Sequence, residues 1–227
     1  MKQNIILDLC GGTGSWSEPF RKIGFKVIVL DIKDGYDITK FGFYHGELSF
    51  GFDKEAIWIN PKKVFGIFAA PPCTHFSFAR TKAKVPRDLE NGMEIVEACL
   101  KIIWICQNNL KKDTQKKSHL KFWALENPNG MLKWFLGKPA FVFNPYDFGD
   151  NYKKKTHIWG DFNEPKKKDK FENLKEISGA EGLKSLVKFD RMLSKDIHPE
   201  YYGKLTRQER RGITPQGFAK AFMEAQI

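Results

Sequence analysis

Cys73 is the residue whose type and position most directly suggest chemistry. It lies in the stretch 67–80, which reads IFAAPPCTHFSFAR, and two prolines separate it from an apolar, β-prone run. Because proline cannot continue a strand ladder, the chain must turn there and present the cysteine on a stiff loop. A thiol in this position is either a nucleophile or a small buried side chain that only packs under the loop. The segment alone leaves both interpretations open.

A glycine-rich loop near the start of the chain suggests a site for a nucleotide-type cofactor. Residues 8–17 read DLCGGTGSWS and follow an apolar strand predicted at 4–9. Glycine lets the backbone approach a ligand closely, although the pattern is not G-x-G-x-x-G. Asp31 follows a second predicted strand, 26–30, about 20 residues beyond the glycines, where nucleotide-binding folds place an acid on ribose hydroxyls. The loop and the acid together predict a cofactor site.

Glu126 and Asn127 repeat this arrangement later in the chain. They follow a strand predicted at 121–125 and precede a proline turn. In a largely parallel sheet the ligand crevice lies at the carboxyl ends of the strands. The four side chains at such ends should therefore share one rim of the sheet. They are Asp8, Asp31, Cys73 and Glu126.

The elements that must position these residues alternate between strands and helices. Apolar residues recur at helical spacing over 89–110, and a shorter helix over 17–24 has Ser17 at its N-cap. Thr214 suits the cap of a C-terminal helix with Pro215 at its first position. This alternation predicts an α/β fold with a mostly parallel central sheet flanked by helices. Strands are also predicted at 64–70 and around 157–159, and no element is assigned over 41–61.

Length, charge and cysteine content limit the class of protein. The chain has 227 residues, enough for one main domain, and its net charge of +11 favours a polyanionic partner such as nucleic acid, although lysines also serve solubility. The four cysteines show neither a Cys-x-x-Cys pair nor a His/Cys metal spacing, so no disulfide framework or zinc site is expected. No apolar run approaches the roughly 20 residues that span a bilayer, and no cleavable signal pattern is present. We therefore expect a cytoplasmic protein.

The order of these motifs resembles that of the DNA cytosine carbon-5 methyltransferases along most of the chain. The glycine loop is similar to the family's methyl-donor loop, APPCTHFS at 70–77 to its nucleophile loop, and ALENP at 124–128 to its Glu-Asn motif. DFGDNYKKKTHIWG at 147–160 resembles its later basic motif. The resemblance implies a Rossmann-like class I S-adenosylmethionine-dependent methyltransferase fold. It also implies methyl transfer from S-adenosylmethionine to carbon 5 of cytosine, with DNA as the expected partner.

The resemblance also implies roles for individual residues. Cys73 would add to carbon 6 of the base, and Glu126 would hold the pairing edge at N3. The expected cofactor-binding residues are those of the donor loop, the next strand ends and the first proline: Asp8, Leu9, Gly11, Gly12, Thr13, Gly14, Asp31, Ile32, Asp37, Ile38 and Pro71. The expected substrate-binding residues flank the nucleophile or lie in basic segments: Pro72, Ser77, Arg80, Asn127, Lys153, Lys155, Arg207 and Arg211. No metal ion is expected.

Several features depart from the family pattern. Thr74 follows the cysteine where glutamine is common, and Lys153 and Lys155 stand where arginines are usual, although lysine cannot form the bidentate fork of arginine. Only a short segment stands where the family carries a target-recognition domain. The expected organisation is a catalytic core, a small basic substrate-binding insertion and a C-terminal helix that packs back on the core: residues 1–161, 162–205 and 206–227.

Other functions stay open on the sequence. A protein of this fold could methylate a pyrimidine nucleotide or RNA, or it could be a non-catalytic nucleic-acid-binding relative. An amino-methyltransferase fits less well, because that class typically has an acidic residue or asparagine before the two prolines and an aromatic after them. Here Ala70 precedes the prolines and Cys73 follows them. The sequence does not indicate the target sequence or the oligomeric state.

Overall fold

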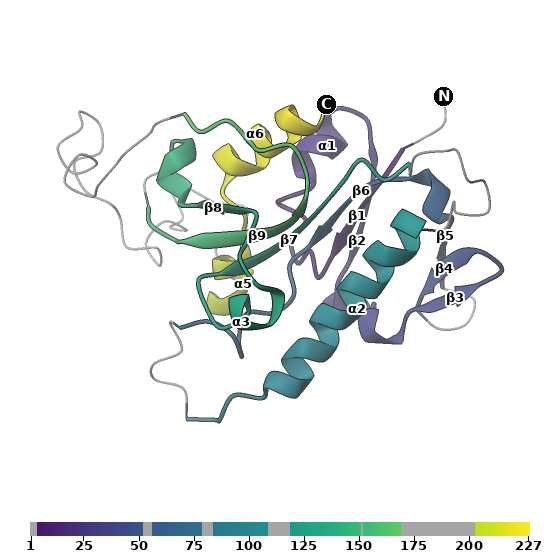
Figure 1. Ribbon diagram of the computed structural model, residues 1–227, viewed down its shortest axis with the longest axis horizontal. Helices are drawn as coiled ribbons and strands as arrows, with labels where there is room; N and C mark the ends of the chain where they lie inside the picture. The colour runs from purple at the N-terminus through teal and green to yellow at the C-terminus, as the bar shows by residue number, and fades with distance from the viewer. Residues whose placement is uncertain (1–3, 52–55, 79–83, 109–118, 151, 169–202) are drawn as a thin grey trace.

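Six strands form the central sheet, in the order β2-β1-β6-β7-β9-β8 (Figure 1). The computed structural model describes residues 4–51, 56–78, 84–108, 119–150, 152–168 and 203–227. Strands β1, β2, β6 and β7 are parallel, whereas β9 runs antiparallel to β7 and β8 antiparallel to β9. The strands are β1 (Ile5–Leu9), β2 (Lys26–Leu30), β6 (Val64–Ala69), β7 (Phe122–Pro128), β8 (Phe141–Phe143) and β9 (Thr156–Asp161). The predicted α/β architecture with a mostly parallel sheet is confirmed at this level.

Helices cover both faces of the sheet, and the apolar sequence of the central strands follows from this. Leu7 of β1 packs into the cluster that α2 (Leu89–Asn108) completes, and the neighbouring Ile6 packs into the opposite cluster with Phe222 of α6 (Gln216–Gln226). The short α1 (Glu18–Lys22) lies with α6 on that second face (Figure 1). Strands buried on both faces read as continuous apolar runs, as β1 and β6 do.

The predicted helices are present, but two of their starts differ in detail. Ser17 occupies the N-cap of α1 without capping it, because its hydroxyl donates to Asp8 instead. The C-terminal helix begins at Gln216 with Pro215 as N-cap, so the predicted cap at Thr214 is wrong. The Thr214 N–H donates to the Ser15 hydroxyl at 2.9 Å, which ties this turn to the glycine loop.

Strand β7 is longer than predicted, and this changes where Glu126 lies. The strand continues through Asn127 to Pro128, so Glu126 is inside the strand and not after its end. The cause is β9, whose antiparallel register pairs Asn127 with His157 and Pro128 with Thr156. A proline at the last position of a strand costs little, because no further ladder bond depends on it.

Residues 41–61, left unassigned from sequence, contain a three-stranded antiparallel sheet. Strands of three or four residues with a positive-φ glycine at the turn show little periodicity, which explains the omission. The strands are β3 (Gly42–Tyr44), β4 (Glu47–Phe50) and β5 (Ile57–Ile59). Two short helices, α3 (Lys133–Leu136) and α5 (Arg207–Gly212), were not predicted either. Within the described residues, no helix is both long and apolar enough to cross a membrane.

Candidate active site

The glycine loop folds tightly over the end of β1. Gly12 and Gly14 have φ values of +54° and +68°, in the left-handed region that favours glycine. At Gly11 the constraint is space: a Cβ there would lie 2.6 Å from the Asp8 carboxyl carbon and 2.8 Å from a methyl of Val29. The loop therefore presents backbone, with no side chain in the way, at the carboxyl end of β1.

Asp8 supports this loop from beneath. It is buried, and the Ser17 hydroxyl donates to its Oδ2 at 2.5 Å. Burial raises the pKa of Asp8 to about 6, while the Ser17 hydrogen bond and the Arg21 charge act in the opposite direction. Leu9 is also fully buried in the core. Of the residues expected at the cofactor, Asp8 and Leu9 thus lie below the loop.

Asp31 links the glycine loop to the turn after β2. Its Oδ2 accepts a hydrogen bond from the Gly12 N–H at 2.9 Å, and its Oδ1 accepts one from the Lys33 N–H at 3.1 Å. The adjacent Ile32 is 71% exposed, so an apolar side chain lies open beside this acid. Asp37 instead caps the 3₁₀ turn Ile38–Lys40, and the Ile38 side chain belongs to the core.

The loop that carries Cys73 is held by hydrogen bonds from three directions. The Asn127 amide donates to the Pro71 carbonyl at 3.0 Å, and the Ser77 N–H donates to the Cys73 carbonyl at 2.9 Å. Arg87 donates from both terminal nitrogens, to the His75 carbonyl at 2.7 Å and to the Ser77 carbonyl at 2.9 Å. A loop fixed in this way gives its cysteine a defined position, as a nucleophile requires.

Glu126 lies close to Cys73, and its charge affects the pKa of the thiol. Burial raises the pKa of Glu126, and the Lys154 ammonium, 3.9 Å from Oε1, opposes this rise. Burial is also the main cause that raises the pKa of Cys73; the Glu126 charge adds to it, while the Lys154 and Arg211 charges lower it. Cys73, Glu126, Lys154 and Arg211 therefore form one electrostatic unit.

Two buried acceptor atoms on β7 accept no hydrogen bond from the described residues. Oε1 of Glu126 and Oδ1 of Asn127 are buried and have no hydrogen-bond partner in the described part of the chain. Buried polar atoms are nearly always paired, so unpaired ones in one place suggest that a ligand supplies the missing donors. Both atoms lie on β7, directly across from the Cys73 loop.

Lys154 was missed in the sequence, which pointed to its neighbours Lys153 and Lys155. The register of β9 explains this, because Ile158 lies opposite Glu126 and side chains alternate along a strand. Counting back in twos from Ile158 reaches Lys154, whereas Lys153 and Lys155 are exposed. The strand period could have identified Lys154, but nothing in the sequence indicated Arg87.

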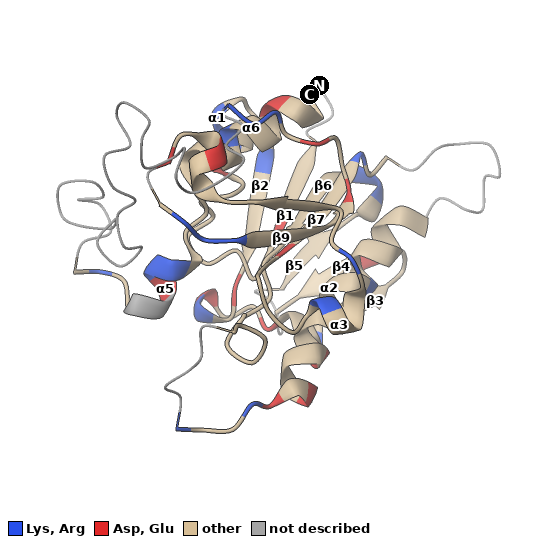
Figure 2. Ribbon diagram, turned by 60° about the vertical axis from the view of Figure 1, so that its left-hand side comes forward, with Lys and Arg blue, Asp and Glu red and all other residues tan. Residues whose placement is uncertain are grey.

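The C-terminal segment links the cofactor side of this site to its Cys73 side. Lys33, near Asp31, forms an ion pair with Glu209 of α5. The Lys154 ammonium donates to the Arg211 carbonyl at 2.9 Å, so α5 also reaches the Glu126 side. Figure 2 shows basic residues on both α5 and α3, which are arginines on α5 and Lys133 on α3.

The remaining expected residues lie around this centre or outside the described residues. Pro71 is buried and Pro72 exposed, and Ser77 pairs with Gly130 in an isolated bridge. Arg80 lies outside the described residues, as do 169–202 of the predicted insertion. Arg207 begins α5, and only its backbone is described. Among the described residues, no group of three His, Cys, Asp or Glu side chains could hold a metal ion.

The chain was compared with protein-family models and with curated proteins. No protein-family model matches it, and no curated protein matches it. The function must therefore be argued from the site itself.

Proposed function

We propose that the protein is an S-adenosylmethionine-dependent methyltransferase that acts on carbon 5 of cytosine in nucleic acid, with DNA as the main acceptor. The observation that carries the proposal is the juxtaposition of Cys73 with Glu126. A thiol on a fixed loop lies beside a buried carboxyl group, one oxygen of which has no hydrogen-bond partner among the described residues. This pair suits a reaction in which sulfur attacks a ring carbon while an acid binds the ring's pairing edge.

The cofactor side of the site has the groups that such a donor needs. The open backbone at Gly12 suits close approach of the amino-acid part, and Asp31 retains lone pairs for ribose hydroxyls. The exposed side chain of Ile32 offers an apolar surface for an adenine ring. When bound, S-adenosylmethionine supplies an electrophilic methyl group on its sulfonium.

The protonation states of Cys73 and Glu126 support each other in this mechanism. Burial raises both pKa values, so Cys73 and Glu126 each hold a proton more tightly than they would in water. A neutral Glu126 no longer raises the pKa of Cys73, and the charges of Lys154 and Arg211 then favour the thiolate. The site is therefore most reactive when the Glu126 carboxyl group is protonated.

The reaction then follows in balanced steps. The Cys73 thiolate forms a bond to carbon 6 of cytosine, and N3 takes the proton of Glu126, so that carbon 5 becomes nucleophilic. Carbon 5 forms its bond to the methyl group, and the bond between that methyl group and the sulfonium sulfur of the donor would break, with its electron pair staying on the sulfur, so that S-adenosylhomocysteine would leave. Loss of the carbon-5 proton to a base breaks the bond between sulfur and carbon 6 and restores the ring, and the N3 proton returns to Glu126. A cytosine in a duplex must leave the stack to reach these residues.

The test is incubation with S-adenosylmethionine carrying a labelled methyl group and with DNA, RNA or cytidine nucleotides in parallel. We expect label on carbon 5 of cytosine, with DNA the best acceptor; a preference for RNA or nucleotides would correct the substrate. Cys73→Ser should abolish turnover and keep cofactor binding in calorimetry, whereas Cys106→Ala, at a cysteine buried in α2, should stay active. Glu126→Gln should lose turnover with little change in Tm. No transfer to any acceptor would refute the proposal.

A further inference from the structure

Two aromatic rings lie exposed beside the Cys73 loop. Trp134 of α3 is 64% exposed and Phe78 is 41% exposed, and their ring centroids are 5.8 Å apart at an interplanar angle of 57°. The Lys133 ammonium lies 5.6 Å from the centre of the Phe78 ring. Exposed aromatic side chains that cluster together indicate a binding surface.

The segments that carry this cluster are connected to the Cys73 loop and to the start of β9. Phe78 comes one residue after Ser77, which bridges to Gly130, and Gly130 follows β7 by two residues. The Met131 N–H donates to the Phe76 carbonyl at 2.8 Å, and the Asn129 N–H donates to the Lys155 carbonyl at 2.9 Å. The turn before α3 therefore joins the nucleophile loop to the start of β9.

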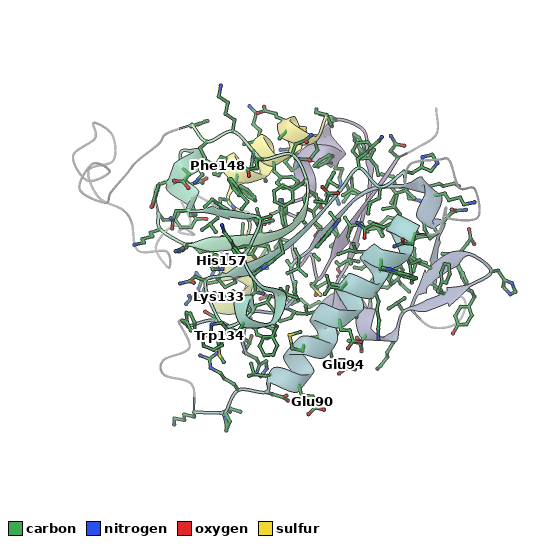
Figure 3. All side chains as sticks on the ribbon, in the orientation of Figure 1. Glu90, Glu94, Lys133, Trp134, Phe148 and His157 are labelled. Atoms are coloured by element: carbon green, nitrogen blue, oxygen red, sulfur yellow. The ribbon has the colours of Figure 1, made fainter. Side chains whose placement is uncertain are left out.

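Positive charge lies close to this cluster. Burial lowers the pKa of His157, and the charges of Lys155 and Lys133 lower it further, so both lysines lie near this imidazole. Figure 3 shows His157, Lys133 and Trp134 grouped together, away from Glu90 and Glu94 of α2. His157 itself is 4% exposed, and its Nδ1 has no hydrogen-bond partner among the described residues. We name the group of Phe78, Lys133, Trp134 and Lys155 the aromatic-basic surface.

We propose that the aromatic-basic surface binds an unstacked base next to the target cytosine, with Trp134 and Phe78 contacting the base and the two lysines its phosphates. Aromatic side chains flanked by cations are the means by which proteins hold single-stranded nucleic acid without reading its sequence. An apolar protein partner would not need the lysines. The inference rests on the proposed function, because it takes the target to lie at Cys73.

The geometry favours single-stranded or locally opened nucleic acid over an intact duplex. A base offers its face to Trp134 only after it has left the stack, and extraction of the target already disrupts stacking beside it. Binding of the neighbouring base would offset part of that cost. The aromatic-basic surface would thus supply part of the substrate binding that a larger recognition domain would otherwise supply.

The experiment is a binding titration of a fluorescently labelled single-stranded DNA that contains one cytosine, and of the duplex made from it. Trp134→Ala and Phe78→Ala should each weaken binding of the single strand by about tenfold, as expected for loss of one base–aromatic stack. The matched control is Trp104→Ala, because Trp104 is equally exposed, 64%, but lies on α2. This control should bind as the wild type does.

A second set of titrations removes a base from the DNA and leaves the aromatic rings of the protein unchanged. Abasic sites are placed one at a time on either side of the cytosine. At one of these positions the abasic site should weaken binding to the wild type, whereas the same site should not weaken binding to Trp134→Ala any further. Equal losses in both proteins, or no effect of Trp134→Ala on affinity, would overturn the inference. A change in oligomeric state of Trp134→Ala in sedimentation, without a change in affinity, would assign the surface to self-association instead. Methyl transfer is measured separately, so an active enzyme whose binding ignores Trp134 refutes only this inference, and an inactive one refutes the proposed function.

Discussion

Lys154 places an ammonium group 3.9 Å from a carboxylate oxygen of Glu126, and its charge also acts on Cys73. It lowers the pKa of both groups in a site where burial raises them. The pKa of Cys73 still lies above its usual value, so Lys154 limits the rise that burial causes without reversing it. Its two exposed neighbours in the sequence provide natural comparisons.

Lys154→Ala should therefore make Cys73 harder to ionise. We expect the pH dependence of Cys73 alkylation by iodoacetamide to move to higher pH, because a charge that lowers the thiol pKa has been removed. The value of kcat/KM at neutral pH should fall on the order of tenfold. Lys153→Ala should leave both measurements unchanged. An unchanged alkylation profile in Lys154→Ala would show that this ammonium does not act on the thiol.

Asp8 gives a second residue-level prediction, about stability. Its pKa rises from 3.8 to about 6 in the folded protein, so the folded state holds the proton more tightly than the unfolded state does. The resulting stability is fully present below pH 3.8 and is lost as pH rises through about 6. Integrated over that window, the shift corresponds to about 3 kcal/mol.

Asp8→Asn cannot titrate and should lack this contribution to the pH dependence. The free energy of unfolding of the wild type, minus that of Asp8→Asn, should decrease between pH 3.8 and about 6 and then level off. Denaturant titrations of both proteins across this range measure the difference. A difference that stays constant with pH would mean that Asp8 has an ordinary pKa in the fold.

Among the elements, the glycine loop depends most strictly on residue size. At Gly11 a methyl group would meet Asp8 and Val29 at 2.6–2.8 Å, whereas at Gly12 nothing lies within 4 Å. Gly11→Ala must displace the loop from β1, and we expect it to abolish cofactor binding and lower Tm. The added methyl group of Gly12→Ala meets open space, so the substitution should lower the free energy of unfolding only by the cost of the left-handed backbone, about 1–2 kcal/mol. Calorimetry with S-adenosylmethionine distinguishes the two, and equal behaviour would contradict the packing argument.

The parallel strands and the long helix could be predicted from the sequence because their apolar runs are long and each ends at a glycine, proline or acid. The predictions failed where tertiary contacts decide. Glu126 lies inside β7 because a distant segment pairs with it, and Lys154 faces the site because of that same register. The aromatic-basic surface went unpredicted, because Phe78 and Trp134 are brought together by tertiary contacts between their segments, such as the bridge between Ser77 and Gly130.

For the molecule as a whole, the net charge of +11 sets how binding should depend on salt. Each phosphate neutralised on a single strand contributes about −0.7 to the slope of log affinity against log salt concentration. Lys133→Ala should reduce the steepness of that slope by about 0.7. Trp134→Ala should weaken binding at every salt concentration and leave the slope unchanged. Identical slopes for Lys133→Ala and wild type would exclude a phosphate contact at this residue.

The packing of α6 has a consequence for the synthesis of the protein. Phe218 and Phe222 cover the face of the sheet that holds Ile6, Phe68 and Phe122. On the ribosome β1, β6 and β7 are complete long before these two phenylalanines are made, so the part of this face that α6 covers stays exposed until α6 is synthesised. Exposed apolar strands favour aggregation, and folding of this face must wait for the emerging C-terminal segment. Slow translation of the segment that encodes α6 would therefore prolong the period in which the nascent chain depends on chaperones.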